Sequence, residues 1–276
     1  MGGGSVRKTN FNQFSFRSRI LGLLKNTALS EGFPDFCGTR VRDMDENSWL
    51  CREEALIGKD NVEKLKKASV LVFGIGGVGS YAVEALARAG IGKLTLVDGD
   101  TVSVSNINRQ LIADTETVGR AKAVVAAERV RKINPSCTVV AVTEFCDETN
   151  TVRVIEDAAP DFIVDAIDCV STKLIIAEYA VSHGMKMISS MGTGNKLYPE
   201  KLRIADISKT EVCPLARVMR KKLRERNILH LPVVFSTEIP VSTGERVPAS
   251  VSFVPSAAGI LIAGYAVRTL IGRQEQ

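Results

Sequence analysis

The sequence predicts an α/β protein, built on a Rossmann-like, mostly parallel sheet with helices on both faces. From Trp49 onward, short apolar segments rich in Val and Ile alternate with helical patterns. Strands that are apolar on both faces are typical of a parallel sheet covered on both sides. In addition, a glycine-rich turn joins the first of these segments to an amphipathic helix, as it does in nucleotide-binding folds.

Five apolar segments are expected to be strands, and three of the stretches between them have helical patterns. The strands are expected at residues 69–74, 93–98, 137–142, 161–167 and 185–191. The helices are expected at residues 80–89, 120–133 and 172–183. The second helix stops before Asn134-Pro135, because proline cannot continue a helix. This alternation favours βαβ units.

Composition sets the broad class. The chain has 276 residues, of which 45% are hydrophobic, and a net charge of +5. That size suits one large domain with a small appendage, and the mild basic bias fits an acidic partner. No C-x-x-C pair occurs, so neither a four-cysteine zinc site nor a thioredoxin-like redox site is indicated, and a reduced intracellular protein is expected. The six cysteines are Cys37, Cys51, Cys137, Cys146, Cys169 and Cys213.

Residues 1–47 differ in composition from the rest. Up to Ser30 they include five basic residues and no acidic one. A basic, acid-free start occurs in organelle transit peptides, and also in disordered tails. We therefore expect a disordered or targeting extension over 1–47 and a nucleotide-binding catalytic domain over 48–276. A cytoplasmic location is predicted, with an organelle as the alternative.

No membrane association is expected. The longest apolar run, residues 257–267, contains two glycines and ends at Arg268. It is shorter than the roughly 18 residues that a membrane-spanning helix needs.

The turn "GIGGVGS" carries a G-x-G-x-x-G motif formed by Gly74, Gly76 and Gly79, with Gly77 as an extra glycine. The first glycine permits the tight turn, the second lets backbone amides approach a phosphate, and the third lets the helix pack on the strand. A phosphate would lie at the helix N-terminus, where unpaired N–H groups favour an anion. A turn selected for packing alone is the alternative, but the flanking strand and helix favour a nucleotide.

Polar residues follow the next expected strand. Asp98 closes that strand about 20 residues after the turn, where a carboxylate can bind ribose hydroxyls. Asp100, Asn106, Arg109 and Gln110 follow in "VDGDTVSVSNINRQ". Asp98 suits both a dehydrogenase and an adenylating enzyme. An arginine beside the nucleotide favours the second, because the charge that develops on a transferring phosphoryl group must be neutralised.

Two further residues extend this pattern. Lys122 places a cation at the start of a helix, and Asp168 places a carboxylate at the end of a strand, where it could bind Mg²⁺. Each has an ordinary alternative: a surface ion pair for Arg109, a solvated helix residue for Lys122 and a helix cap for Asp168. Their joint occurrence favours a Mg-ATP site over a noncatalytic or NAD-binding Rossmann protein.

The motifs "GIGGVGS", "DGDTVSVSNINRQ", "VGRAK" and "DAID", in this order, resemble the ThiF-type, ubiquitin-activating-enzyme-like adenylyltransferases. The resemblance implies that fold, a homodimer and the activation of a carboxylate by ATP and Mg²⁺. It assigns the phosphates to the turn 74–79, the ribose to Asp98, and the magnesium to Asp168. It assigns the triphosphate to Asn106, Arg109 and Lys122, with Asp100 and Gln110 beside the same nucleotide. Arg52, in "LCREEALIG", matches an arginine that reaches into the ATP site of the partner subunit.

Two later stretches narrow the resemblance. The segments "GTGNKLYPEKLRIADISKTEVCPLARVMRKKLRERNI" and "ASVSFVPSAAGILIAGYAVRTLIG" resemble the tRNA threonylcarbamoyladenosine dehydratases. That resemblance implies ATP-dependent cyclisation of threonylcarbamoyladenosine in tRNA, and it suggests a cysteine desulfurase system as a protein partner. The alternative is an adenylyltransferase that activates the C-terminus of a sulfur-carrier or ubiquitin-like protein. The absence of the paired C-x-x-C motifs usual in sulfur-carrier activators favours the dehydratase.

A basic amphipathic helix is expected after Cys213. Its apolar residues have helical spacing: Leu215, Val218, Met219 and Leu223. Around them stand six cations: Arg217, Arg220, Lys221, Lys222, Arg224 and Arg226. Such a helix could follow tRNA phosphates, lie on a membrane surface or present a solvated face. Cys213 is a candidate nucleophile because relatives in the superfamily form thioesters; a loop cysteine before Pro214 is the alternative. His183 and His230 are assigned no role.

Overall fold

The computed structural model describes residues 48–245 and 247–273, all of which belong to one unit, Met44–Gln276. The extension expected over 1–47 lies outside the described residues, so its boundary and its role stay predictions.

The described residues form one seven-stranded sheet with the order β3-β2-β1-β4-β5-β7-β6. Only β6 runs antiparallel to its neighbour. The strands are β1 (Ser69–Phe73), β2 (Lys93–Val97), β3 (Thr138–Val142), β4 (Phe162–Asp165), β5 (Lys186–Ser190), β6 (Leu202–Asp206) and β7 (Pro232–Ser236). The predicted mostly parallel sheet is confirmed, and β1 to β5 fall within the five expected segments. The sequence did not indicate β6 and β7.

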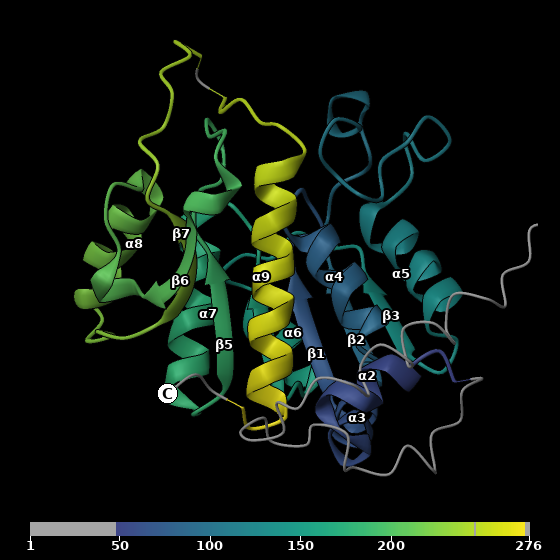
Figure 1. The fold of residues 1–276 in the computed structure, drawn as a ribbon. Coiled ribbons are helices and arrows are strands. Elements are labelled where there is room, and N and C mark those ends of the chain that lie inside the picture. The colour runs from purple at the N-terminus through teal and green to yellow at the C-terminus, as the bar shows by residue number, and fades with distance from the viewer. Residues whose placement is uncertain (1–47, 246, 274–276) are drawn as a thin grey trace, which may run out of the picture. The chain divides into compact units, whose positions relative to one another are not determined.

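Helices cover both faces of the sheet (Figure 1). α3 (Lys59–Lys67), α4 (Gly79–Arg88), α5 (Lys122–Ile133) and α9 (Phe253–Leu270) share a core on one face. α6 (Thr151–Ala158), α7 (Val170–Ser182) and α8 (Pro214–Arg224) share a core on the other. α2 (Cys51–Ile57) precedes α3, and three short 3₁₀ helices are η2 (Val104–Asn106), η3 (Pro199–Lys201) and η4 (Ile207–Lys209).

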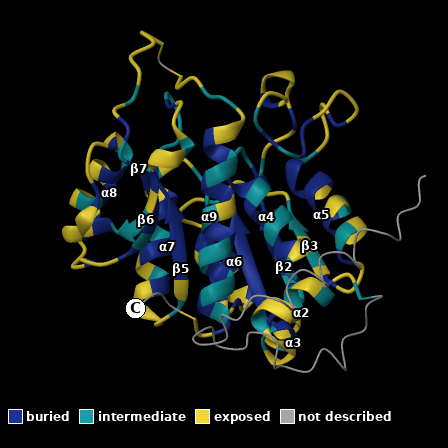
Figure 2. Cartoon of the chain, in the orientation of Figure 1, coloured by how far each residue is buried: buried dark blue, intermediate teal, exposed yellow. Residues whose placement is uncertain are grey.

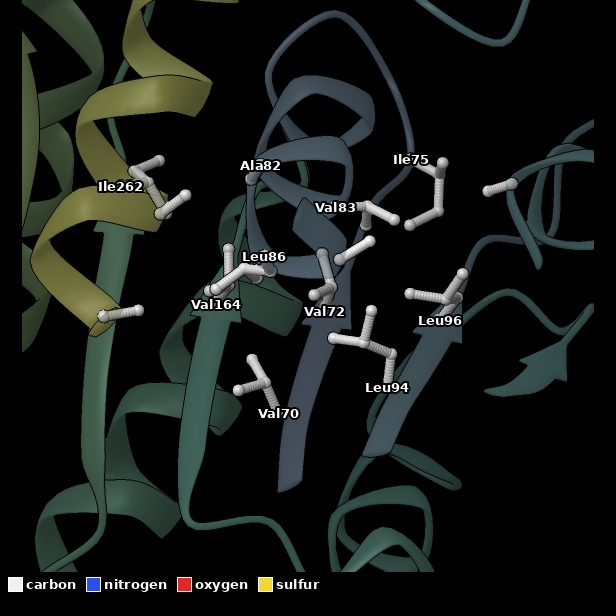
Figure 3. Packing of buried hydrophobic residues seen from close by; sticks show 14 of the residues in the cluster. Val70, Val72, Ile75, Ala82, Val83, Leu86, Leu94, Leu96, Val164 and Ile262 are labelled. Carbon is white, nitrogen blue, oxygen red and sulfur yellow. The ribbon is translucent and has the colours of Figure 1, made fainter. Parts of the chain in front are cut away.

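The two cores follow from side-chain alternation along the strands. In β1, Val70 and Val72 face the core shared with α4 and α9, as Figure 3 shows. Leu71 and Phe73 face the core shared with α6, α7 and α8. Figure 2 shows the strands at the centre of the sheet as the most buried elements. β3 is less completely covered than the central strands: Val140 is 42% exposed, because β3 lies at the edge of the sheet.

α9 packs along α4 and across β4, β5 and β7. At their crossing, a Cβ on Gly259 would lie 2.3 Å from the carbonyl oxygen of Val78, so only glycine permits this approach. Contrary to the expectation from its longest apolar run, α9 is the one described helix long and apolar enough to cross a membrane, with a mean hydropathy of 1.4 over 18 residues. Within the structure, 44% of that stretch is buried.

The strand order places a crevice beside β1. The chain runs from β1 to β2 and β3 on one side, then returns to place β4 on the other side. In open α/β sheets, ligands bind outside the carboxyl ends of the strands at such a reversal of strand order.

Candidate active site

A cavity of about 580 Å³ lies at the carboxyl ends of β1, β2, β4 and β5. It is lined by ten of the twelve residues that the sequence singles out for a nucleotide or metal: Gly74, Gly76, Gly77, Asp98, Asp100, Asn106, Arg109, Gln110, Lys122 and Asp168. Gly79 and Arg52 do not line it. The parallel strands bring these residues together because their carboxyl ends meet at one edge of the sheet.

The glycines of the turn differ in what they permit. Gly74 has a φ of +83°, which favours glycine, and a Cβ there would lie 2.8 Å from the carbonyl oxygen of Ala166. A Cβ on Gly79 would lie 1.8 Å from the carbonyl oxygen of Gly74, so this glycine lets α4 pack against the end of β1. Gly76 meets no close neighbour and faces the cavity, with Gln110 Nε2 3.8 Å from where its Cβ would be. Gly76 therefore leaves room for a ligand.

Asp98 is tied to the glycine turn. Ile75 N donates to Asp98 Oδ2 at 2.6 Å, and Asp100 N donates to Oδ1 at 2.9 Å. Burial raises the pKa of the Asp98 carboxyl, while the Ile75 amide and the charge of Lys122 act in the opposite direction. The two amides orient the Asp98 carboxylate just beyond the carboxyl end of β2, where ribose hydroxyls could donate to its remaining lone pairs.

Lys122 is buried rather than solvated. Its side chain is 7% exposed, and Nζ donates to Asp100 Oδ2 at 2.8 Å. A bridge between Thr101 and Ala121, with Lys122 N donating to Asp100 O at 3.0 Å, closes the intervening loop and holds this pair at the cavity. Lys122 therefore supplies a fixed positive charge whose only ion-pair partner within the described chain is Asp100.

Some side chains of the closed loop hold the loop in place, and others could contact a ligand. Asn106 Oδ1 accepts from Ser103 N at 3.1 Å and so holds η2. Arg109 Nη1 donates to Ser105 O at 2.8 Å and to Asn108 Oδ1 at 3.0 Å, but forms no ion pair with any described residue. Gln110 Oε1 is buried and has no hydrogen-bond partner among the described residues. The unpaired buried acceptor of Gln110 favours a ligand that offers a hydrogen-bond donor. Arg109, which has no counterion among the described residues, favours an anionic group on the same ligand.

Asp168 lies exposed in the loop between β4 and α7 and lines the cavity. The described residues contain no group of three or more metal-binding side chains. This donor set still fits Mg²⁺, which is usually held by one or two carboxylates together with waters and substrate phosphates.

The cavity also has lining residues that the sequence did not indicate. Phe145 is 70% exposed, and its ring lies so close to Gly99 that a Cβ there would come within 2.6 Å of Phe145 Cγ. Cys146 and Cys169 also line the cavity. Further lining residues come from the segment 190–194 at the end of β5, and from Leu215, Pro248, Ser250 and Pro255. An aromatic residue three positions beyond the end of β3 was the one available signal for Phe145.

Comparison with known proteins agrees with this geometry. Residues 50–276 match the ThiF family. The chain belongs to the ThiF family. Among similar proteins, the tRNA threonylcarbamoyladenosine dehydratase of Bacillus subtilis is 40% identical over 238 residues, which cover 80% of this chain and 93% of that protein. The tRNA threonylcarbamoyladenosine dehydratase 2 of Saccharomyces cerevisiae is 44% identical over 67% of this chain and 42% of its own length.

Solved structures lead to the same part of the ThiF family. The E. coli tRNA N6-threonylcarbamoyladenosine dehydratase TcdA in complex with ATP is 34% identical, with a TM-score of 0.75 over 79% of this chain and 92% of that one. E. coli MccB, bound to ATP, is 21% identical with a TM-score of 0.60 and shows the shared fold alone. The resemblance drawn from the motifs is confirmed.

Arg52 of this ThiF-family chain lies far from its own cavity. It is an exposed residue of α2, which Figure 1 shows at the end of the sheet where the parallel strands begin. Leu50, just before α2, packs against Gly90 after the C-terminal end of α4. Arg52 therefore has no role at the phosphate turn of its own subunit.

α8 begins beside the cavity, where Leu215 lines it. Met219 and Leu223 are buried as expected, but Val218 is exposed. Four cations are exposed and form no ion pair with any described residue: Arg217, Lys221, Lys222 and Arg224. The other two are engaged. Arg220 Nη1 donates to Thr210 O at 2.7 Å, and Arg226 Nε lies 3.1 Å from Glu178 Oε1.

Cys213 and the two histidines do not line the cavity. Cys213 is buried at the start of α8, which argues against its role as a nucleophile. His183 stacks on Tyr179, and His230 Nδ1 lies 3.3 Å from Asp206 Oδ2.

Proposed function

We propose that this protein is an ATP-dependent tRNA threonylcarbamoyladenosine dehydratase. The observation that carries the proposal is one cavity that joins a glycine phosphate turn, two cations and Asp168, on a chain that covers nearly all of a bacterial dehydratase. A dehydrogenase has no need of Arg109 and Lys122, whereas a triphosphate has.

Different residues bind different parts of ATP. Amides of the turn 74–79 bind phosphate, Asp98 accepts from the ribose, and the exposed ring of Phe145 next to Gly99 supports the base. Arg109 and Lys122 neutralise charge that develops on the phosphoryl oxygens. Asp168 would hold Mg²⁺, which would supply further charge neutralisation.

The chemistry needs no side-chain nucleophile. An oxygen of the threonyl carboxylate attacks a phosphorus of ATP and displaces its leaving group, which forms a mixed anhydride. A nitrogen of the same modification then attacks the carbonyl carbon, and the C–O bond to the phosphorus-bearing group breaks. The lost water is thus carried away as phosphate oxygen and a proton. The protein contributes orientation, charge neutralisation and exclusion of water.

The part of the cavity lined by residues 190–194 and Leu215 would receive the modified nucleoside. From Leu215, α8 extends with four exposed cations that form no ion pair within the described part of the chain, and these could neutralise tRNA phosphates. The alternative substrate, a sulfur-carrier protein, has weaker support: the sulfur carrier protein adenylyltransferase of Thermus thermophilus is 36% identical over only 48% of this chain.

The assembly and location that we propose are a homodimer in the cytoplasm. α9 leaves Phe253 48% exposed and Ile260 51% exposed, and a second copy would cover such apolar residues. Arg52 would then enter the partner's cavity. The bacterial relatives favour a cytoplasmic location, while the organelle alternative rests only on the composition of residues 1–47. A cysteine desulfurase system as partner rests on the family resemblance alone.

The test is direct. Purified protein, ATP, Mg²⁺ and tRNA that carries open threonylcarbamoyladenosine should yield the cyclic nucleoside, measured by mass spectrometry of digested tRNA. Calorimetry should show ATP bound in preference to NAD. Unchanged nucleoside, together with ATP-dependent adenylation of a sulfur-carrier protein, would replace the proposal with the alternative.

A further inference from the structure

A buried ion pair lies directly behind the cavity and takes no part in the proposed chemistry. Lys173 in α7 and Asp165 at the end of β4 have side chains that are 0% and 1% exposed, with Nζ 2.9 Å from Oδ2. Ser189 of β5 completes the group: its hydroxyl donates to Asp165 Oδ2 at 2.6 Å, and Lys173 Nζ lies 3.1 Å from the same hydroxyl. None of the three lines the cavity.

The group reaches the two loops that do line it. Asp165 Oδ1 accepts from Ile167 N at 3.3 Å, one residue before Asp168. Lys173 Nζ also donates to Ser190 O at 2.8 Å, at the start of the loop that follows β5. One ammonium group and one carboxylate therefore connect the loop 166–169 with the segment 190–194, both of which contribute residues to the cavity lining.

A contribution to folding stability does not explain the buried pair of Asp165 and Lys173 well. Removing two charges from water is expensive, and replacing a buried pair with neutral groups of similar shape is often neutral or stabilising. A buried polar group whose partners are all satisfied does, however, impose one arrangement on the elements that it joins. Here the elements joined are those that hold Asp168 and the segment 190–194.

We propose that Asp165 and Lys173 are a positioning pair, which sets the separation of the Asp168 loop from the loop that receives the modified nucleoside. The catalytic consequence rests on the proposed function, whereas the structural consequence does not. Productive geometry is sensitive at this level, since a misplacement of about 1 Å can cost on the order of 10²-fold in rate.

The experiment compares a neutral pair with a matched control. Lys173→Met/Asp165→Asn removes both charges, keeps similar shapes and leaves no unpaired charge. Asn134→Ala is the control, because Asn134 is also buried and donates from Nδ2 to Ile91 O at 3.1 Å, at the other end of the sheet. Ser189→Ala is a milder third variant, which removes only the hydroxyl that joins the pair.

In the neutral pair, amide hydrogen exchange should accelerate at 166–169 and 190–194, and kcat should fall about 100-fold. The Kd for ATP should stay within about threefold of the parent value. The glycine turn that binds the phosphates follows β1, whereas the substituted pair lies on β4 and α7. Asn134→Ala should change none of these, and Ser189→Ala should shift exchange and kcat in the same direction by less.

Unchanged exchange in both loops of a folded neutral pair overturns the proposal, whatever the activity. If the neutral-pair variant does not fold, unchanged exchange in both loops of Ser189→Ala overturns the proposal instead. A parent protein without dehydratase activity would contradict the proposed function, while the exchange measurement would still decide the positioning role.

Discussion

At the scale of single residues, Cys169 combines exposure with unusual acidity. Hydrogen bonds from Ser171 and Thr172 lower the pKa of its thiol to about 7, whereas burial raises the pKa of Cys146, in the same cavity, to about 11. Near neutral pH, about half of the Cys169 side chains are thiolate, which is the nucleophilic form.

Iodoacetamide should therefore label Cys169 before Cys146. A thiol becomes thiolate as pH rises through its pKa, which is about 7 for Cys169. The labelling rate of Cys169 should therefore increase from pH 6 to pH 8, with a midpoint near 7. ATP should slow the reaction, because Cys169 lines the cavity. Peptide mass spectrometry measures both effects, with Cys169→Ser as the control. A midpoint above pH 8.5 would contradict the assigned environment.

Asp168→Ala should abolish turnover and leave the fold intact. The Asp168 carboxylate is exposed and makes no hydrogen bond with any described residue, so the free energy of unfolding should change by no more than about 0.5 kcal/mol. Asp60→Ala, at an exposed position in α3, should keep parental activity. Nucleoside analysis of the tRNA measures turnover, and thermal melting measures the stability of each variant. An active Asp168→Ala protein would show that the metal is held elsewhere.

The sequence indicates those site residues that sit in local patterns and misses those created by tertiary contacts. Gly74, Asp98 and Asp168 follow strand ends, so parallel strands alone predict that they meet. Lys173 lies within a helical stretch, and nothing in its neighbours shows that it will be buried against Asp165 and Ser189. That contact depends on how α7 packs on β4 and β5, which a one-dimensional pattern does not specify.

At the scale of elements, strand prediction depends on burial. β1 and β4 lie near the centre of the sheet, every residue in them is buried, and their sequences are mostly apolar. β6 was missed because it is an edge strand in which Leu202 is the only fully buried residue, so its sequence "LRIAD" lacks the apolar run. β7 is buried, but its sequence "PVVFS" begins with a proline, which is more typical of a loop or a turn.

α8 carries the prediction about tRNA. Replacing Lys221, Lys222 and Arg224 with Gln should weaken tRNA binding and flatten the slope of log affinity against log salt by about two, because each phosphate contact contributes roughly 0.7–0.9. ATP affinity should not change, since these residues lie outside the cavity.

The control is the triple Gln replacement of Lys59, Lys64 and Lys67 in α3, which are equally exposed but lie at the opposite end of the sheet (Figure 1). A salt titration on the parent and both variants separates the cases. An equal slope in the parent and the α8 variant would remove α8 from the tRNA site. Lost vesicle binding with intact tRNA affinity would instead assign α8 to a membrane surface.

At the scale of the whole molecule, the position of Arg52 makes the dimer testable. Arg52→Ala and Asp168→Ala proteins should each be inactive as homodimers. After subunit exchange at equal concentrations, half of the dimers carry one intact site, so about a quarter of parental activity should return. Native mass spectrometry measures the heterodimer fraction. Heterodimers without activity would show that Arg52 does not complete the partner's site.

The packing of α9 has a consequence for biosynthesis. α4 and the strands around β1 form early in the chain, yet the helix that covers them along β4 and β5 begins only at Phe253. On the ribosome, an apolar surface that includes Val164 and Ile188 stays uncovered until residues beyond 250 have emerged. We therefore expect nascent chains arrested before α9 to bind a general chaperone, and the released chain to lose that binding once α9 has packed.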